Sequence, residues 1–90
     1  MYTLQEIGKE MESLKGWSFE SNSIVKDFSF ENFKESLDFV NKIGEIAEKL
    51  NHHPDIQINY NLVRLNLTTH SARTLTKIDF DVAREIDLIN

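Results

Sequence analysis

The sequence contains no cysteine, which excludes disulfide bonds, thiolate zinc sites, iron–sulfur clusters and a cysteine nucleophile. Its 90 residues include only one proline and three glycines, so we expect short turns rather than a long linker. No uninterrupted apolar run approaches the ~20 residues of a membrane span. The first residues lack the basic and apolar stretches of a secretory signal peptide. These absences predict a cytoplasmic location and no membrane partner.

Basic residues are also scarce, with 10 lysines and arginines against 15 aspartates and glutamates and a net charge of −5. They are scattered along the chain, so we expect no direct nucleic-acid partner. With 40% hydrophobic and 28% charged residues, the composition is typical of one globular domain, which we place over residues 1–90. A domain of this size buries one modest core, and a homodimer or homotetramer would bury more surface.

The spacing of apolar residues predicts seven elements. Helical spacing predicts helices over 3–15, 31–50 and 77–88, and alternation predicts strands over 17–21, 24–30, 56–60 and 63–69. The turns within each strand pair are short, so the paired strands should be antiparallel. The expected fold class is α+β: a four-stranded antiparallel sheet with three helices on one face, in the order α-β-β-α-β-β-α.

Several residues are typical of element boundaries. Gly16 is placed to end the first helix in the left-handed conformation, and Pro54 requires the long helix to end before it. Thr76 and Asp79 have the spacing of a capping box, so a structural role is favoured for Asp79. Trp17 is interpreted as a core or pocket-wall residue.

The three histidines, His52, His53 and His70, are the candidates for chemistry, because imidazole can both donate and accept a proton near neutral pH. The first two follow the long helix, and His70 ends the last strand, so we expect the three rings to meet in one pocket. Solvated surface histidines are one alternative. A three-histidine zinc site is another, disfavoured because adjacent histidines point apart and no acidic fourth ligand has a typical spacing.

The residues around these histidines resemble the signature of the pterin-4a-carbinolamine dehydratase (4a-hydroxytetrahydrobiopterin dehydratase) family. The matching positions are Glu48-Lys49-Leu50-Asn51-His52-His53-Pro54, then Tyr60, Thr69-His70 and Asp79. The resemblance extends over about residues 14–88 through Trp17, Phe28, Phe30, Phe33, Leu75-Thr76-Lys77-Ile78-Asp79 and Ala83. It implies the same four-stranded sheet with three helices on one side.

The resemblance also implies an activity, the dehydration of 4a-hydroxytetrahydropterin to quinonoid dihydropterin in tetrahydropterin recycling. The reaction needs a general acid and a general base, and no metal, nucleotide or other cofactor. By resemblance, His52 is the principal acid/base group at the 4a-hydroxyl and His70 is the second proton-transfer group. His53 positions the substrate.

The resemblance further implies a set of pterin-contacting residues, which are Glu48, Asn51, Pro54, Thr68, Thr69 and Ser71. Glu48 precedes His52 by four residues, so we expect its carboxylate to meet and orient the His52 imidazole on one helix face. Arg73 and Thr74 stand where the family usually has a glycine. The turn after His70 could therefore differ, with Arg73 reaching the pocket or a partner.

A binding module is the alternative function. Some relatives act as dimerisation or assembly partners of another protein, such as a transcription factor. The predicted helix over 31–50 has two neighbouring apolar ridges, one of them including Phe33 and Leu37. Such a face is wide enough to leave apolar surface for a protein partner. Enzyme and binding module remain compatible with each other.

Overall fold

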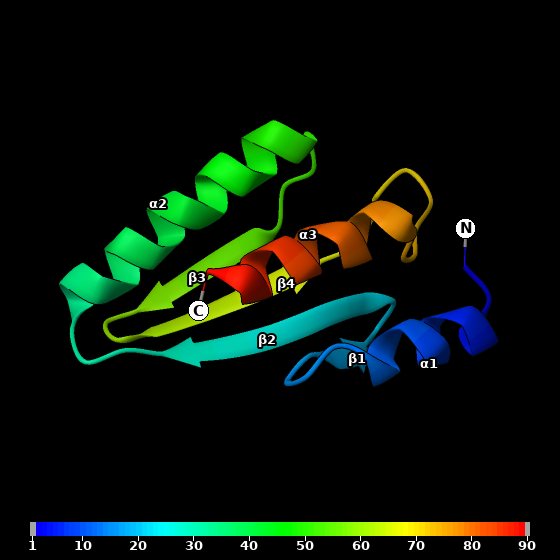
Figure 1. Cartoon of the computed structure of the whole chain (residues 1–90), viewed down its shortest axis with the longest axis horizontal. Coiled ribbons are helices and arrows are strands. Elements are labelled where there is room, and N and C mark those ends of the chain that lie inside the picture. The colour runs from blue at the N-terminus through cyan, green and yellow to red at the C-terminus, as the bar shows by residue number, and fades with distance from the viewer. Residues whose placement is uncertain (1, 90) are drawn as a thin grey trace.

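The computed structural model describes residues 2–89 and has helices and strands in the predicted order (Figure 1). The elements are α1 (Leu4–Glu12), β1 (Ser18–Glu20), β2 (Ser23–Ser29), α2 (Phe33–Leu50), β3 (Asp55–Asn59), β4 (Leu62–Leu67) and α3 (Lys77–Leu88). Among the described residues, no helix combines the length and the apolar character needed to cross a membrane.

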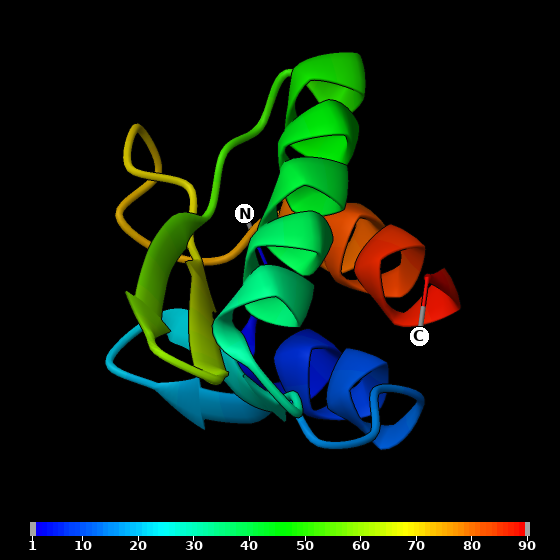
Figure 2. The same cartoon turned by 90° about the vertical axis from the view of Figure 1, so that its left-hand side faces the viewer.

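The four strands form one antiparallel sheet in the order β1-β2-β4-β3. Strands β2 and β4 pair in the centre, from Ile24 opposite Leu67 to Ser29 opposite Leu62, although α2 and β3 lie between them in the chain. Figure 2 shows the three helices on one side of the sheet. The predicted fold class is therefore confirmed.

The core lies between the helices and the covered face of the sheet. Alternation in β4 decides which side chains enter it, because Val63, Leu65 and Leu67 are fully buried. Helices α2 and α3 cover these residues with a second buried set, which comprises Phe39, Ile43, Ala47, Phe80, Val82, Ala83 and Ile86. On the opposite face, Arg64 donates to the Asp27 carboxylate of the neighbouring strand at 2.8 and 3.1 Å.

Some expected boundaries are wrong. Helix α1 ends at Glu12 rather than near residue 15, and Gly16 has its left-handed φ of 85° in the loop that leads to β1. Strand β4 ends at Leu67, because the chain then enters a turn in which the Thr69 N–H donates to the Thr74 carbonyl at 3.1 Å. On α2, Phe33 and Leu37 are 46% and 39% exposed, so the first two turns of one predicted ridge lie outside the core, whereas Ala47 of the same ridge is buried.

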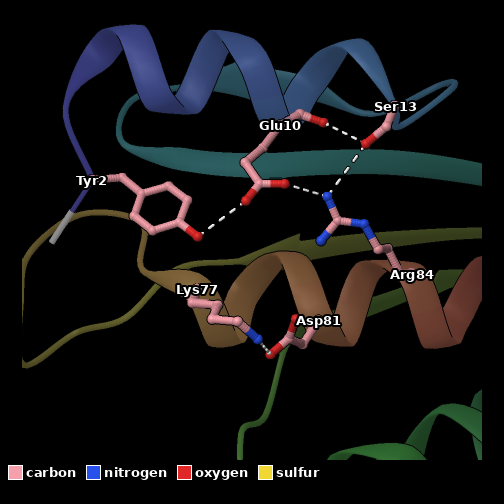
Figure 3. A network of polar contacts seen from close by, with 6 residues as sticks. All are labelled: Tyr2, Glu10, Ser13, Lys77, Asp81 and Arg84. Carbon is pink, nitrogen blue, oxygen red and sulfur yellow. Dashed lines mark hydrogen bonds and ion pairs between the residues drawn. The ribbon is translucent and has the colours of Figure 1, made fainter.

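Helix α1 is attached to α3 by polar contacts at the molecular surface (Figure 3). The Glu10 carboxylate accepts from the Arg84 guanidinium and, at 3.0 Å, from the Tyr2 hydroxyl. Arg84 also donates to the Ser13 hydroxyl at 3.2 Å. The Tyr2 ring stacks on Phe80 with ring centroids 5.4 Å apart. These contacts tie the N-terminal segment to α3.

A second polar junction joins α3 to the sheet. The buried Trp17 donates from its indole N–H to the Asp87 carboxylate, with distances of 3.0 and 3.1 Å to the two oxygens. The Lys26 ammonium donates to the same carboxylate at 3.0 Å and to the Lys15 carbonyl at 2.9 Å. Trp17 is therefore a core residue whose polar edge joins two distant parts of the chain.

Candidate active site

His52 is directed toward α3 by the way α2 ends. Asn51 caps this helix in the left-handed conformation, with φ 51° and ψ 44°, and the His52 N–H donates back to the Ala47 carbonyl at 3.0 Å. The His52 side chain is 15% exposed, and its Nε2 lies 2.5 Å from Oδ1 of Asp79. Asp79 itself is fully buried in the first turn of α3.

The other oxygen of Asp79 has two further partners. Oδ2 accepts from the Thr69 hydroxyl at 2.7 Å and from the Thr76 backbone N–H at 2.9 Å. One buried carboxylate thus joins the end of α2, the segment after β4 and the start of α3. Figure 1 places these three segments toward the same end of the molecule. The contacts with His52, Thr69 and Thr76 replace the water that an exposed carboxylate would bind.

The capping role predicted for Asp79 is confirmed, because its carboxylate accepts from the Thr76 N–H. That prediction missed the contact with His52. The capping contact occupies one carboxylate oxygen, which leaves the second free for a group from elsewhere in the chain. The presence of Asp79 in the signature with the histidines was the available signal.

The expected pairing of Glu48 with His52 is wrong. The Glu48 carboxylate lies 2.5 Å from Nε2 of His53 instead, and these two side chains are 78% and 55% exposed. The four-residue spacing holds only while the backbone stays helical, and it fails here because Asn51 turns the chain into the left-handed region. The two adjacent histidines consequently have separate carboxylate partners.

His70 lies in a turn beyond β4 rather than at the strand end. Its carbonyl accepts from the Arg73 N–H at 3.1 Å, and Arg73 adopts a left-handed φ of 57°. The His70 side chain is exposed. Because Thr69 bonds to Asp79, the turn that carries His70 is fixed beside the His52–Asp79 pair. The structure therefore places the turn of His70 next to the His52–Asp79 contact, while His53 pairs with Glu48 on an exposed surface.

The remaining predicted site residues surround this arrangement. The Thr68 hydroxyl donates to the Asn22 carbonyl at 2.8 Å, and the Thr69 hydroxyl donates to Asp79, so both donors are engaged within the protein. Ser71 is exposed in the turn with His70, Asn51 caps α2, and Pro54 is half-buried before β3. The contacts of these residues with a pterin stay predictions.

The expected pocket between the histidines is not among three hollows formed by the described residues. Two of them, of about 220 and 370 Å³, lie between α2 and Ile89, and a third of about 310 Å³ lies between Tyr2 and α1; no histidine lines any of the three. In residues 2–89, no group of three or more histidine, aspartate or glutamate side chains is placed to hold a metal ion.

The His52–Asp79 contact defines which imidazole nitrogen is available to a bound molecule. Oδ2 of Asp79 accepts from Thr69 and Thr76, and when the carboxylate is ionised Oδ1 can only accept as well, which assigns the proton in its contact with His52 to Nε2. Nδ1, which makes no hydrogen bond within residues 2–89, is then the nitrogen available to exchange a proton with a ligand. This arrangement, an imidazole oriented by a buried carboxylate, is suited to general acid–base chemistry.

Comparisons with known proteins agree on one family. The model of the Pterin 4 alpha carbinolamine dehydratase family matches residues 1–89. Two curated relatives named for this family are 47% identical over 85 residues in Sulfurisphaera tokodaii and 50% identical over 82 residues in Picosynechococcus sp.. The alignments cover 94% and 91% of this chain and 91% and 89% of the relatives.

Solved structures give the same result. A transcriptional coactivator/pterin dehydratase from Brucella melitensis superposes with a TM-score of 0.92 at 32% identity, covering 98% of this chain and 96% of that one. A pterin dehydratase-like RuBisCO assembly factor of the alpha-carboxysome superposes with a TM-score of 0.66 at 16% identity, covering 81% and 84%. The second likeness shows the fold alone.

The sheet, the helices and the oriented histidine define a small α+β protein of the pterin dehydratase fold. The chain belongs to the pterin-4-alpha-carbinolamine dehydratase family.

Proposed function

We propose that this protein dehydrates 4a-hydroxytetrahydropterin to quinonoid dihydropterin and water. In this reaction the C4a–O bond breaks, the oxygen receives a proton and leaves as water, and the N5 lone pair forms the C4a=N5 double bond. Removal of a ring proton completes the neutral product. The observation that carries the proposal is the His52–Asp79 pair, held beside the turn of His70 in a chain of this family.

His52 is the group proposed to act on the 4a-hydroxyl. Its Nδ1 is free while its Nε2–H is bonded to Asp79, so the ring keeps one orientation whether Nδ1 holds a proton or not. A ring with a fixed orientation delivers its proton along a defined direction, which is a condition for efficient proton transfer. The substrate hydroxyl would therefore lie on the Nδ1 side of His52.

His70 and His53 have different proposed roles. His70 lies on the neighbouring turn and is the candidate for removing the ring proton, so that separate groups act as acid and as base. His53, bonded to the exposed Glu48, is proposed to bind and position the pterin together with Asn51 and Pro54. Backbone groups of the turn around Ser71 are the proposed contacts from the other side.

The test is the stopped-flow loss of 4a-hydroxytetrahydropterin absorbance with purified protein. We expect clear acceleration over the buffer-catalysed rate. His52→Ala should remove about a hundredfold or more of that acceleration, since general acid–base catalysis contributes on the order of 10²–10⁴-fold. His53→Ala should act mainly on KM, and His70→Ala mainly on kcat. Wild-type protein that gives no acceleration contradicts the proposal.

Binding of a protein partner on α2 is a second candidate function. It is favoured by Phe33 and Leu37, which lie one helical turn apart and are 46% and 39% exposed. Self-association into a homodimer or homotetramer is included, because Phe33 and Leu37 of α2 are partly exposed and β3 is an edge strand of the sheet.

Phe33→Glu and Leu37→Glu test this second candidate. We expect either charge to weaken association, measured by sedimentation velocity and by affinity capture from lysate, while His52→Ala leaves association unchanged. Association that persists in the Phe33→Glu/Leu37→Glu double variant rules out this surface. The dehydration assay on the same samples separates the two functions.

A further inference from the structure

We propose that Thr69 is a positioning residue that holds His52 in its working orientation through Asp79. The inference rests on the proposed function only for its effect on dehydration. Thr69 does not contact the His52 ring in the observed hydrogen bonds, because its hydroxyl bonds to Asp79 and Thr76. Its role is therefore indirect, through the carboxylate that pairs with Nε2 of His52.

The direction of each hydrogen bond in this network follows from the number of protons. The Thr69 hydroxyl has one proton, which it donates to Oδ2 of Asp79 at 2.7 Å. The contact of 2.8 Å between the hydroxyls of Thr69 and Thr76 must then use the proton of Thr76. The result is a directed chain, from Thr76 to Thr69 to Asp79, which ends at the carboxylate opposite His52.

Loss of the Thr69 hydroxyl would leave Oδ2 of Asp79 with the Thr76 N–H as its observed donor. Asp79 is fully buried, so water does not replace the missing donor without a rearrangement. Rotation of the carboxylate toward another donor moves Oδ1 away from Nε2 of His52. A change at Thr69 is thereby transmitted to the imidazole.

Thr69 also precedes His70 in the chain. Its backbone N–H donates to the Thr74 carbonyl at 3.1 Å and its carbonyl accepts from the Ala72 N–H at 3.0 Å, so the same residue closes the turn of His70. The backbone bonds of Thr69 thus hold the turn that carries His70, while its side chain holds Asp79, the partner of His52. The spacing of the two proposed proton-transfer groups depends on this single residue.

The experiment removes the hydroxyl and follows the Nε2–H proton of His52 by NMR, together with kcat and KM for 4a-hydroxytetrahydropterin. Thr69→Val keeps the shape of the side chain and Thr69→Ser keeps the hydroxyl. Thr74→Val is the matched control in the same turn, because within residues 2–89 the observed contacts of Thr74 are made by its backbone. Urea unfolding of each variant establishes that it is folded.

We expect a downfield, exchange-protected His52 Nε2–H resonance in the wild type, in Thr69→Ser and in Thr74→Val. Thr69→Val should shift this resonance upfield or lose it to exchange, and should lower kcat about tenfold or more at nearly unchanged KM. If Thr69→Val does not fold, Thr69→Cys compared with Thr69→Ser removes the strong donor in a side chain of similar size. A folded variant without the hydroxyl that keeps the wild-type resonance overturns the proposal.

The resonance and the kinetics also distinguish the two proposals. If wild-type protein does not accelerate dehydration but Thr69→Val still loses the Nε2–H resonance, the proposed reaction fails and the positioning role of Thr69 stands. If the wild type is active and Thr69→Val matches it in both the resonance and kcat, the positioning role fails and the proposed reaction stands.

Discussion

The two carboxylate oxygens of Asp79 have different partners, His52 on one side and Thr69 with Thr76 on the other. Asp79→Asn tests whether both oxygens must accept hydrogen bonds. An amide has one accepting oxygen, so its NH₂ group must face either the His52 N–H or the two donors at Oδ2. We expect a loss of dehydration and a destabilisation of about 1–3 kcal/mol, because buried donors lose an acceptor. Stopped-flow kinetics and urea unfolding measure the two effects; unchanged kinetics would separate Asp79 from the reaction.

The single residue Glu10 predicts a dependence of protein stability on pH. The Arg84 hydrogen bond is the largest cause that lowers the pKa of Glu10 below its ordinary value of 4.5, against an opposing effect of burial. A lowered folded-state pKa stabilises the fold above the unfolded-state pKa, and this stabilisation is lost as the pH falls through the folded-state value. Glu10→Gln should therefore be less stable than wild type near pH 7, with the difference disappearing toward pH 3.

The expected difference for Glu10→Gln at neutral pH is on the order of 0.5–1 kcal/mol, since Arg84 is 41% exposed and solvent screens the pair. Urea unfolding of both proteins between pH 3 and 7 provides the measurement. Arg84→Gln serves as the control, because it removes the same pair from the other side. A stability difference that does not change with pH contradicts the argument.

At the scale of elements, periodicity predicted the type and order of every helix and strand, because each buries one face against the same core. It was weaker at their ends. The shorter α1 and the early end of β4 depend on turn hydrogen bonds, such as that from Thr69 to Thr74, which have no periodic signal. The spacing also grouped the exposed Phe33 and Leu37 with the buried Ala47, since apolar spacing shows which residues share a face and not what covers it.

The end of α2 offers a prediction at this scale through Asn51, which caps the helix with a left-handed φ of 51°. Asn51→Ala should destabilise the protein by about 1 kcal/mol, because alanine has a Cβ but lacks the short polar side chain that makes this region accessible to asparagine. Asn51→Gly should stay within about 0.5 kcal/mol of wild type, because glycine adopts it freely. Both variants lose the side-chain amide that we predict to contact the pterin, so both should raise KM by about fivefold, the effect of one neutral hydrogen bond.

Thermal unfolding and steady-state kinetics on the two Asn51 variants keep stability and binding apart. Equal KM values in the two variants, with different stabilities, are the expected pattern. An Asn51→Gly protein with wild-type KM would remove the amide from the substrate-binding set and leave Asn51 as a helix cap only.

At the scale of the whole molecule, the junction of Trp17, Lys26 and Asp87 joins the loop after α1, strand β2 and the last turn of α3. Asp87→Ala removes the acceptor of both donors and leaves the Lys26 ammonium, in a side chain only 20% exposed, without its counterion. We expect a loss of about 2 kcal/mol in unfolding free energy. Lys26→Met should cost about 1 kcal/mol or less, because it keeps the packing against Trp17 and Phe28.

Urea unfolding of Asp87→Ala, Lys26→Met and the double variant measures this junction. The double variant should lose less unfolding free energy than the two single losses added together. The Lys26–Asp87 interaction is lost in each single variant, so the sum counts it twice. Additive effects would show that the lysine and the aspartate act independently.

Much of the candidate site was recognisable from the sequence, since the signature named His52, His53, His70 and Asp79 together. The partners of these residues were not. The bond between His52 and Asp79 crosses 27 positions and depends on how the ends of α2 and α3 meet, which is decided by tertiary packing. The pairing of Glu48 was misassigned because helical spacing was extended past Asn51, the residue at which the helix ends.

The left-handed residue at the end of α2 has one further consequence. It sends two consecutive imidazoles in divergent directions, one against the interior and one toward the solvent. The two rings are therefore not duplicates, although they are chemically identical and adjacent in the chain. When His52 is replaced, we therefore expect that His53 does not take over its contact with Asp79.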